Sequence, residues 1–117
     1  IVNISSGAAT MPYPGWSLYC ASKAATDMLA RVSAAEQEGS ENAARVIAVA
    51  PGVVDTEMQS TIRQTSAEDF PKRERFVQLH QQGKLDTAEH AAAQVLRALD
   101  DPEVESGEVV DVRSRYG

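Results

Sequence analysis

The sequence predicts an α/β fold in which three short parallel strands are flanked by helices. Two short runs, Ile1–Ile4 and Arg45–Ala50, are rich in β-branched or small apolar residues, which is typical of strands buried on both faces of a parallel sheet. A long amphipathic stretch separates them, and parallel strands need such a crossover helix. A third apolar run, Gly107–Val112, predicts the last strand.

The longest predicted helix runs from Ser17 to about Glu38, with Ser17 as its N-cap and Gly39 as the residue that ends it. Small and apolar side chains recur along it at spacings of three and four. They form one face, made of Ala21, Ala24, Ala25, Met28, Leu29 and Val32. This face could cover the sheet or pack against another helix.

Residues 56–82 predict two short helices with a break near Pro71, and their apolar contacts are Met58, Ile62, Phe70, Phe76 and Leu79. A further helix is expected from its N-cap Thr87 to Leu99, with the inner residues Ala91, Ala92, Val95, Leu96 and Leu99. Crossovers between parallel strands are almost always right-handed. The two long helices could therefore cover opposite faces of the sheet only if the strand order reversed or residues 56–82 changed sides.

The composition excludes several classes of protein. Hydrophobic residues make up 43% of the chain, enough for a core, and the net charge of −6 argues against nucleic-acid binding, which requires a basic face. The single Cys20 excludes an internal disulfide and fits a reducing compartment. No apolar run approaches the ~18 residues of a membrane helix and no signal peptide is visible, so we expect a cytoplasmic protein with no membrane partner. His80 and His90 are expected at the surface, without neighbouring ligand residues and not as metal ligands.

A candidate acid–base site begins with Tyr19 and Lys23. They lie four residues apart and therefore share one face of the predicted helix. A phenol is a poor proton donor near neutral pH, but an adjacent ammonium lowers the pKa of a phenol. Ser5 and Ser6 end the first predicted strand, where a hydroxyl could hold the substrate oxygen that receives the proton. On its own, however, a Tyr-x-x-x-Lys pair is common on helices as a half-buried aromatic beside a solvated charge.

Three separated motifs, in this order, resemble the C-terminal half of the short-chain dehydrogenase/reductase superfamily: Asn3-Ile4-Ser5-Ser6, Tyr19-Cys20-Ala21-Ser22-Lys23 and Ala50-Pro51-Gly52-Val53-Val54-Asp55-Thr56. Within it the chain is most similar to the sepiapterin reductases, through Gly15-Trp16, Asp27-Met28-Leu29, Asp55-Thr56-Glu57-Met58-Gln59, Gly83-Lys84-Leu85 and Ser106–Asp111. The resemblance implies that residues 1–117 form the C-terminal half of one Rossmann-type domain, a doubly wound parallel sheet, with a lid over about 56–82. It also places Ile1 in the middle of that fold, so we expect a longer protein.

The resemblance also implies a role for each site residue. Ser6 lies thirteen positions before Tyr19, the spacing of the family's catalytic serine and tyrosine, and Lys23 would both activate Tyr19 and hold the nicotinamide ribose. The implied cofactor contacts are Tyr19, Lys23, Pro51, Gly52, Val54 and Thr56, and the implied substrate contacts are Ser6, Trp16, Met58 and Asp111. Asp111 could equally be a solvated carboxylate at the strand end, and Arg113 or Arg115 could pair with it.

The resemblance implies an NADP(H)-dependent oxidoreductase, with NAD as the alternative cofactor. Hydride transfer would reduce a ketone on a pterin side chain or a small dicarbonyl, with Tyr19 protonating the carbonyl oxygen. One alternative is a general carbonyl or diketone reductase. Another is a non-catalytic fragment that acts as a binding or assembly module. In the family the Ser17–Glu38 helix helps to build a subunit interface, so the resemblance implies a homodimer or homotetramer.

Overall fold

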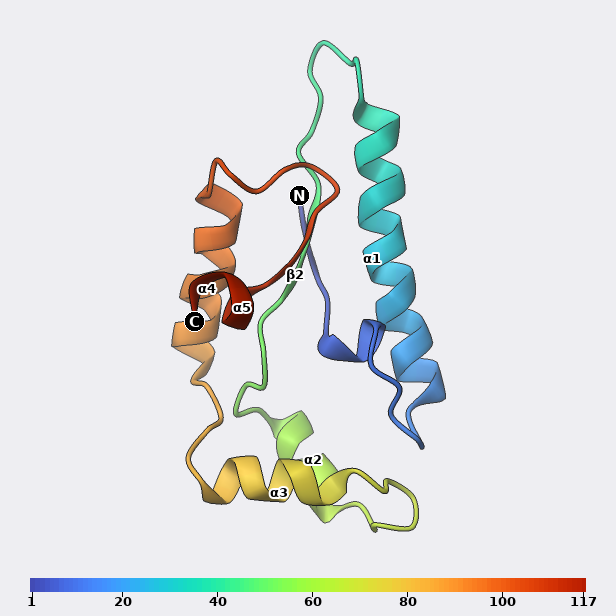
Figure 1. Ribbon diagram of the computed structural model, residues 1–117, viewed down its shortest axis with the longest axis vertical. Helices are drawn as coiled ribbons and strands as arrows, with labels where there is room; N and C mark the ends of the chain where they lie inside the picture. Colours follow the sequence, from blue (N-terminus) through green and yellow to red (C-terminus); the bar gives the residue numbers. More distant parts are fainter.

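The sheet lies at the centre of the protein, between helices on both of its faces (Figure 1). The computed structural model describes residues 1–117. Its strands are β1 (Val2–Ile4), β2 (Ile47–Ala50) and β3 (Val109–Asp111), all parallel and in the order β1-β2-β3. Ala48 of the central strand lies opposite Asn3 of β1 and Val109 of β3. The predicted fold class, three parallel strands with flanking helices, is confirmed.

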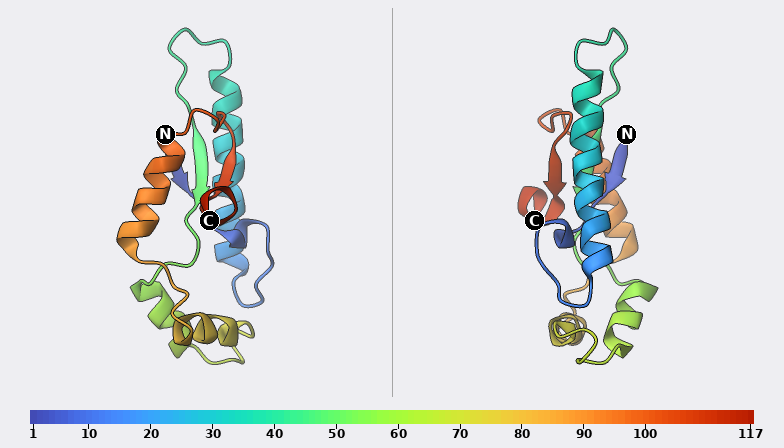
Figure 2. Two further views of the ribbon diagram at one scale, coloured as in Figure 1. Left: turned by 60° about the vertical axis from the view of Figure 1, so that its left-hand side comes forward. Right: turned by 90° about the vertical axis from the view of Figure 1, so that its right-hand side faces the viewer.

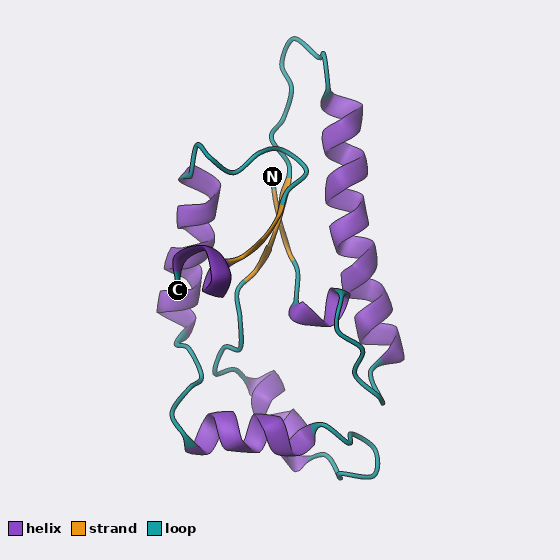
Figure 3. Ribbon diagram, viewed as in Figure 1, coloured by secondary structure: helices purple, strands orange, loops and turns teal.

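Helices occupy most of the remaining chain (Figure 3). A short 3-10 turn, η1 (Gly7–Ala9), is followed by α1 (Ser17–Gln37), α2 (Glu57–Gln64), α3 (Arg73–Gln81), α4 (Ala88–Asp100) and α5 (Val112–Tyr116). The predicted break near Pro71 separates α2 from α3, and the Thr87 hydroxyl caps α4 by accepting the His90 N–H. None of these helices combines the length and apolar character that a membrane span requires.

The central strand separates two apolar layers. Ile47 of β2 belongs to a buried cluster with Ala98 of α4, whereas the next residue, Ala48, belongs to a cluster with Ala30 and Ala34 of α1. Successive side chains of a strand point to opposite faces, so α1 and α4 cover opposite faces of the sheet, as the views of Figures 1 and 2 show.

The two crossovers have opposite handedness. The strand order follows the sequence, β1-β2-β3, while α1 and α4 lie on opposite faces. Two right-handed connections in one direction would place both helices on the same face, so the prediction that both are right-handed is wrong for one of them. The segment with α2 and α3 runs below the carboxyl ends of the strands and carries the chain to the other face (Figure 1).

The predicted apolar face of α1 does not cover the sheet. The side chains that α1 buries are those of Asp27, Ala30 and Ala34, whereas Met28 and Leu29 are 55% and 58% exposed. The helix also starts differently, because its N-cap is Trp16, without a side-chain cap bond, and not Ser17. The small residues that approach the sheet lie beside the predicted face, so the apolar face remains open to solvent.

On α4, two of the predicted inner residues are buried or half-buried and three are not. Ala91 is buried and Val95 packs against the sheet cluster, but Leu96 and Leu99 are exposed and Ala92 is not covered either. Ala98, which was not predicted, takes the central inner position. Apolar residues of α4 therefore extend beyond the strip that faces the sheet.

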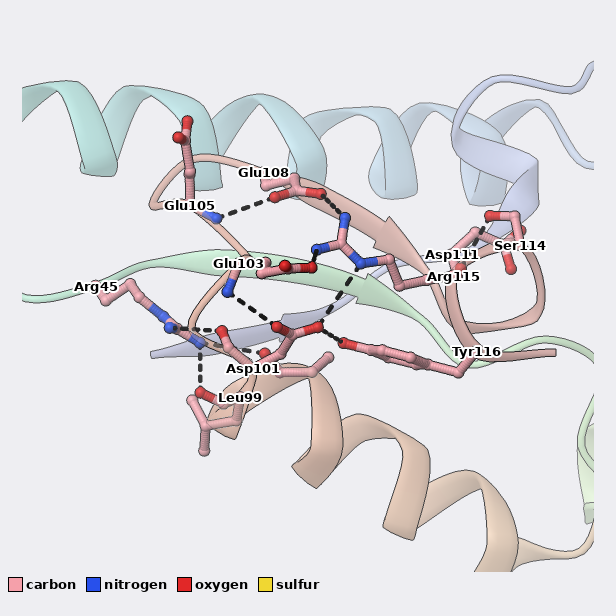
Figure 4. Close-up of polar contacts among 11 residues, drawn as sticks. Arg45, Leu99, Asp101, Glu103, Glu105, Glu108, Asp111, Ser114, Arg115 and Tyr116 are labelled. Carbon is pink, nitrogen blue, oxygen red and sulfur yellow. Dashed lines mark hydrogen bonds and ion pairs between the residues drawn. The ribbon is translucent and has the colours of Figure 1, made fainter.

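The segment after α4 is tied together by polar contacts (Figure 4). The Tyr116 hydroxyl donates a hydrogen bond of 2.7 Å to Asp101, which lowers the pKa of that carboxyl, and Arg115 lies between Asp101 and Glu108. The Arg45 guanidinium donates to backbone carbonyls at the end of α4. The helix α5 was not predicted; the expected strand 107–112 is shorter, because Asp111 caps α5 through the Arg113 N–H at 2.9 Å.

Candidate active site

A cavity of about 430 Å³ lies at the carboxyl ends of β1 and β2. Ligands of open parallel α/β sheets bind at this edge. The cavity brings together nine of the predicted site residues: Ser6, Trp16, Tyr19, Lys23, Pro51, Gly52, Val54, Thr56 and Met58. Asp111 is not part of its lining.

Tyr19 and Lys23 enter the cavity from the first turns of α1. The Lys23 ammonium lies 5.8 Å from the centre of the Tyr19 ring and donates a hydrogen bond of 2.9 Å to the Ile4 carbonyl at the end of β1. An ammonium has three N–H donors, so this bond holds Lys23 against the strand and leaves donors for a ligand. The one-turn spacing thus places a phenol and a cation on the same wall.

The two serines at the end of β1 have different partners. Ser5 is buried and donates its hydroxyl proton to the buried carboxylate of Asp27 on α1. The Ser6 hydroxyl instead accepts the Ala8 N–H at 3.1 Å, as the N-cap of η1. A hydroxyl that accepts a bond keeps its own proton free to donate. Of the two, Ser6 is therefore the one that lines the cavity with an available proton.

The loop after β2 forms the second wall. Gly52 has a φ of 86°, a left-handed conformation that favours glycine. Two backbone hydrogen bonds fix the loop to the residue before the α4 cap, from Asp55 N–H to the Asp86 carbonyl at 2.8 Å and from Asp86 N–H to the Val53 carbonyl at 2.9 Å. Pro51, Gly52 and Val54 of this loop line the same cavity as Tyr19 and Lys23 of α1.

Five of the six aromatic residues of the chain gather in one cluster beside the cavity: Tyr13, Trp16, Tyr19, Phe70 and Phe76. Trp16 stacks on Phe70 with ring centres 4.4 Å apart and planes 5° from parallel, and it meets Tyr19 edge-on at 5.3 Å. Phe70 and Phe76 belong to residues 56–82, the predicted lid. The cluster therefore joins this segment to the loop before α1 and to the Tyr19 ring.

Two arginines of the cavity were not among the predicted site residues. Arg75 of α3 donates a hydrogen bond of 2.6 Å to the Tyr13 hydroxyl, and Arg113 of α5 holds Asp111 through Nε at 3.1 Å and Nη2 at 2.6 Å. Asp111 thus pairs with Arg113, as one of the alternatives anticipated, whereas Arg115 pairs with other carboxylates. One signal in the sequence could have identified Arg113 as a cavity residue: it comes just after a predicted strand that ends at this edge of the sheet.

The histidines lie outside the cavity. Contrary to the expectation, His90 has polar neighbours. Its Nδ1 lies 2.7 Å from the Asp86 carboxylate, and its Nε2 lies 3.1 Å from the Gln94 amide nitrogen. His80 is exposed on α3. No group of three or more His, Cys, Asp or Glu side chains is arranged to hold a metal ion.

Comparison with known proteins assigns the family. The profile of the family described as short chain dehydrogenase matches residues 1–67, which contain Ser6, Tyr19, Lys23 and the loop after β2. The chain belongs to the short-chain dehydrogenase family. The match ends before α3, so the cavity residues of α3, α4 and α5 lie outside it.

Similar proteins include reductases of two kinds. A Bacillus cereus benzil reductase, described as (S)-benzoin forming, is 42% identical over 96% of this chain and 45% of its own length. A Meriones unguiculatus sepiapterin reductase is 43% identical over 95% of this chain and 40% of its own length. A short-chain dehydrogenase/reductase structure from Saccharomyces cerevisiae has a TM-score of 0.77 at 32% identity, over 95% of this chain and 44% of that chain. The chain thus spans less than half the length of these relatives.

Proposed function

We propose that the protein is an NADP(H)-dependent oxidoreductase that reduces a ketone, with Tyr19 as the proton donor. The observation that carries the proposal is the convergence of Ser6, Tyr19 and Lys23 on one cavity, opposite the loop at Pro51. A protein that reduces a carbonyl group needs a proton donor, a hydroxyl and a cation. The relatives, a benzil reductase and a sepiapterin reductase, support the same class of reaction.

Ser6, Tyr19 and Lys23 have distinct tasks in this proposal. The Ser6 hydroxyl donates to the substrate carbonyl oxygen and fixes its position. Tyr19 transfers its proton to the same oxygen as negative charge develops on it. Lys23, held on the Ile4 carbonyl, places its ammonium 5.8 Å from the centre of the Tyr19 ring, on the wall that carries the proton donor.

The residues present fit the nicotinamide end of NADP(H). Lys23 has free N–H donors for ribose hydroxyls, Thr56 offers a hydroxyl, and Pro51 and Val54 add an apolar surface for a flat ring. When bound, the nicotinamide supplies the hydride that is added to the carbonyl carbon. NAD remains the alternative cofactor in this proposal.

The test is an assay of NADPH and NADH oxidation by the full-length protein with sepiapterin and with phenylpropanedione. Reduction of either ketone supports the proposal, and the ratio of the two efficiencies separates a pterin reductase from a general diketone reductase. If neither cofactor binds and neither ketone is reduced, the alternative of a non-catalytic binding or assembly module replaces it.

The exposed apolar face of α1 supports self-association, and we propose a homodimer or homotetramer through this face. Leu29 lies in it and is 58% exposed. Leu29→Glu should shift the assembly towards monomer, because a charge buried in an apolar interface is costly. Light scattering after size exclusion measures the shift. The matched control is Leu96→Glu, the same change at a leucine of α4 that is 59% exposed; an equal shift in both variants contradicts an interface on α1.

A further inference from the structure

The charges of the cavity differ from those of the whole chain. The chain has 17 acidic and 11 basic residues, yet the cavity is lined by Lys23, Arg75 and Arg113 and by no aspartate or glutamate. A cleft lined by one sign of charge favours ligands of the complementary kind. The lining therefore offers hydrogen-bond donors and positive charge, and it suits a substrate rich in oxygen acceptors.

Of the three cations, only Arg113 reaches across the carboxyl ends of the strands to the loop after β2. Lys23 is held by the Ile4 carbonyl and Arg75 by the Tyr13 hydroxyl. Arg113 extends over the loop after β2, since a Cβ built on Gly52 would lie 3.0 Å from its Cδ, and its Nη2 lies 3.9 Å from the corresponding position at Gly7. Its guanidinium thus lies between the loop and the residue that follows Ser6.

Asp111 orients this guanidinium and neutralises it. Its carboxylate accepts the backbone N–H, Nε and Nη2 of Arg113, and these bonds lower the pKa of Asp111, so the pair stays ionised. A guanidinium has five N–H donors, and three remain after the two side-chain bonds. A neutral ion pair with free donors suits a neutral carbonyl oxygen better than a carboxylate.

We propose that Arg113 determines specificity by donating to a second carbonyl oxygen, beside the ketone that is reduced, so that the protein prefers vicinal dicarbonyl substrates. The inference rests on the proposed function and names its substrate class. The edge of a pterin that presents amino and ring N–H donors cannot bind Arg113, because a guanidinium has no acceptor. Asp111 then acts as a positioning residue for Arg113 and does not contact the substrate.

The experiment compares catalytic efficiency for phenylpropanedione and for propiophenone, which has the same skeleton with one carbonyl fewer. Arg113→Met should lower the ratio of the two efficiencies by about tenfold or more, because it removes a charge-assisted bond that only the diketone makes. The different intrinsic reactivities of the ketones cancel, since the ratio is compared between proteins. Arg115→Met is the matched control: Arg115 lies two residues away but pairs outside the cavity, so the ratio should not change.

Asp111→Asn gives an independent readout. It retains the shape of the side chain but leaves the Arg113 charge uncompensated, so the efficiency for benzoylformate should rise relative to phenylpropanedione by about tenfold. Calorimetry with oxidised NADP present, which prevents reduction, should show phenylpropanedione binding about tenfold more weakly to Arg113→Met than to the unchanged protein.

Three results overturn the inference: equal losses for both ketones in Arg113→Met, diketone affinity unchanged in that variant, or a selective loss of sepiapterin reduction in Asp111→Asn. The last would mean that Asp111 itself binds the substrate. Failure of the proposed function is a different result, namely no cofactor oxidation with any ketone by the unchanged protein. In that case the calorimetric comparison still decides whether Arg113 binds the diketone.

Discussion

Tyr19→Phe is expected to lower kcat for ketone reduction by about 10²-fold or more, the range that general acid catalysis contributes. The change removes one oxygen and leaves the ring, which packs edge-on against Trp16 at 5.3 Å. The fold, the contacts of residues 56–82 and the proposed cofactor contacts of Lys23 and the Pro51 loop should therefore persist. Stopped-flow or steady-state kinetics measure the loss, and the NADPH dissociation constant should stay within about twofold.

A control variant is needed to attribute the loss of kcat to the Tyr19 hydroxyl. Tyr13→Phe removes the hydroxyl of another tyrosine that lines the same cavity and bonds Arg75. Its effect on kcat should be small, because Tyr13 has no part in proton transfer. A Tyr19→Phe protein with near-normal turnover, or equal losses in both variants, would show that Tyr19 is only a member of the aromatic cluster.

Lys23→Met is expected to lower kcat and also to weaken NADPH binding, each by about tenfold or more, because one ammonium serves both. Methionine has a stem of similar length without the charge, so it loses the bond to the Ile4 carbonyl and any bond to a ribose. Fluorescence titration gives the dissociation constant of NADPH, and kinetics give kcat.

The matched control is Lys84→Met, which removes the same charge at a lysine outside this cavity. Thermal unfolding must accompany both variants, since the Lys23 bond also ties α1 to β1. A Lys23→Met protein with unchanged affinity for NADPH and a reduced melting temperature would assign Lys23 a structural role alone.

Local signals predicted much of the fold. The apolar runs identified all three strands, Thr87 identified the start of α4, and Pro71 identified the break between α2 and α3. The short helix α5 was missed because Val112 extends the apolar run of β3, although Asp111 followed by a short polar stretch is an N-cap signal.

Features that depend on tertiary structure could not be predicted from local signals in the sequence. Periodicity located an apolar face on α1, but the sheet contacts the neighbouring face, which carries Asp27 and two alanines. Burial of Asp27 depends on its bond with Ser5, a residue from another element. The handedness of the crossovers depends in the same way on the path of residues 56–82, which carry the chain to the other face of the sheet. For the site, nine of the ten residues that the family resemblance implied line one cavity, while the pairing of Asp111 with Arg113 depends on the turn of α5.

The residues proposed for chemistry and those proposed for substrate choice come from separate parts of the chain. Tyr19 and Lys23 lie on α1, whereas Asp111 and Arg113 lie at the junction of β3 and α5. Substitutions at this junction can therefore change which ketones are accepted without altering the proton donor. Under the two proposals, this separation makes residues 111–113 a small target for redesigning the substrate range while the proton donor is retained.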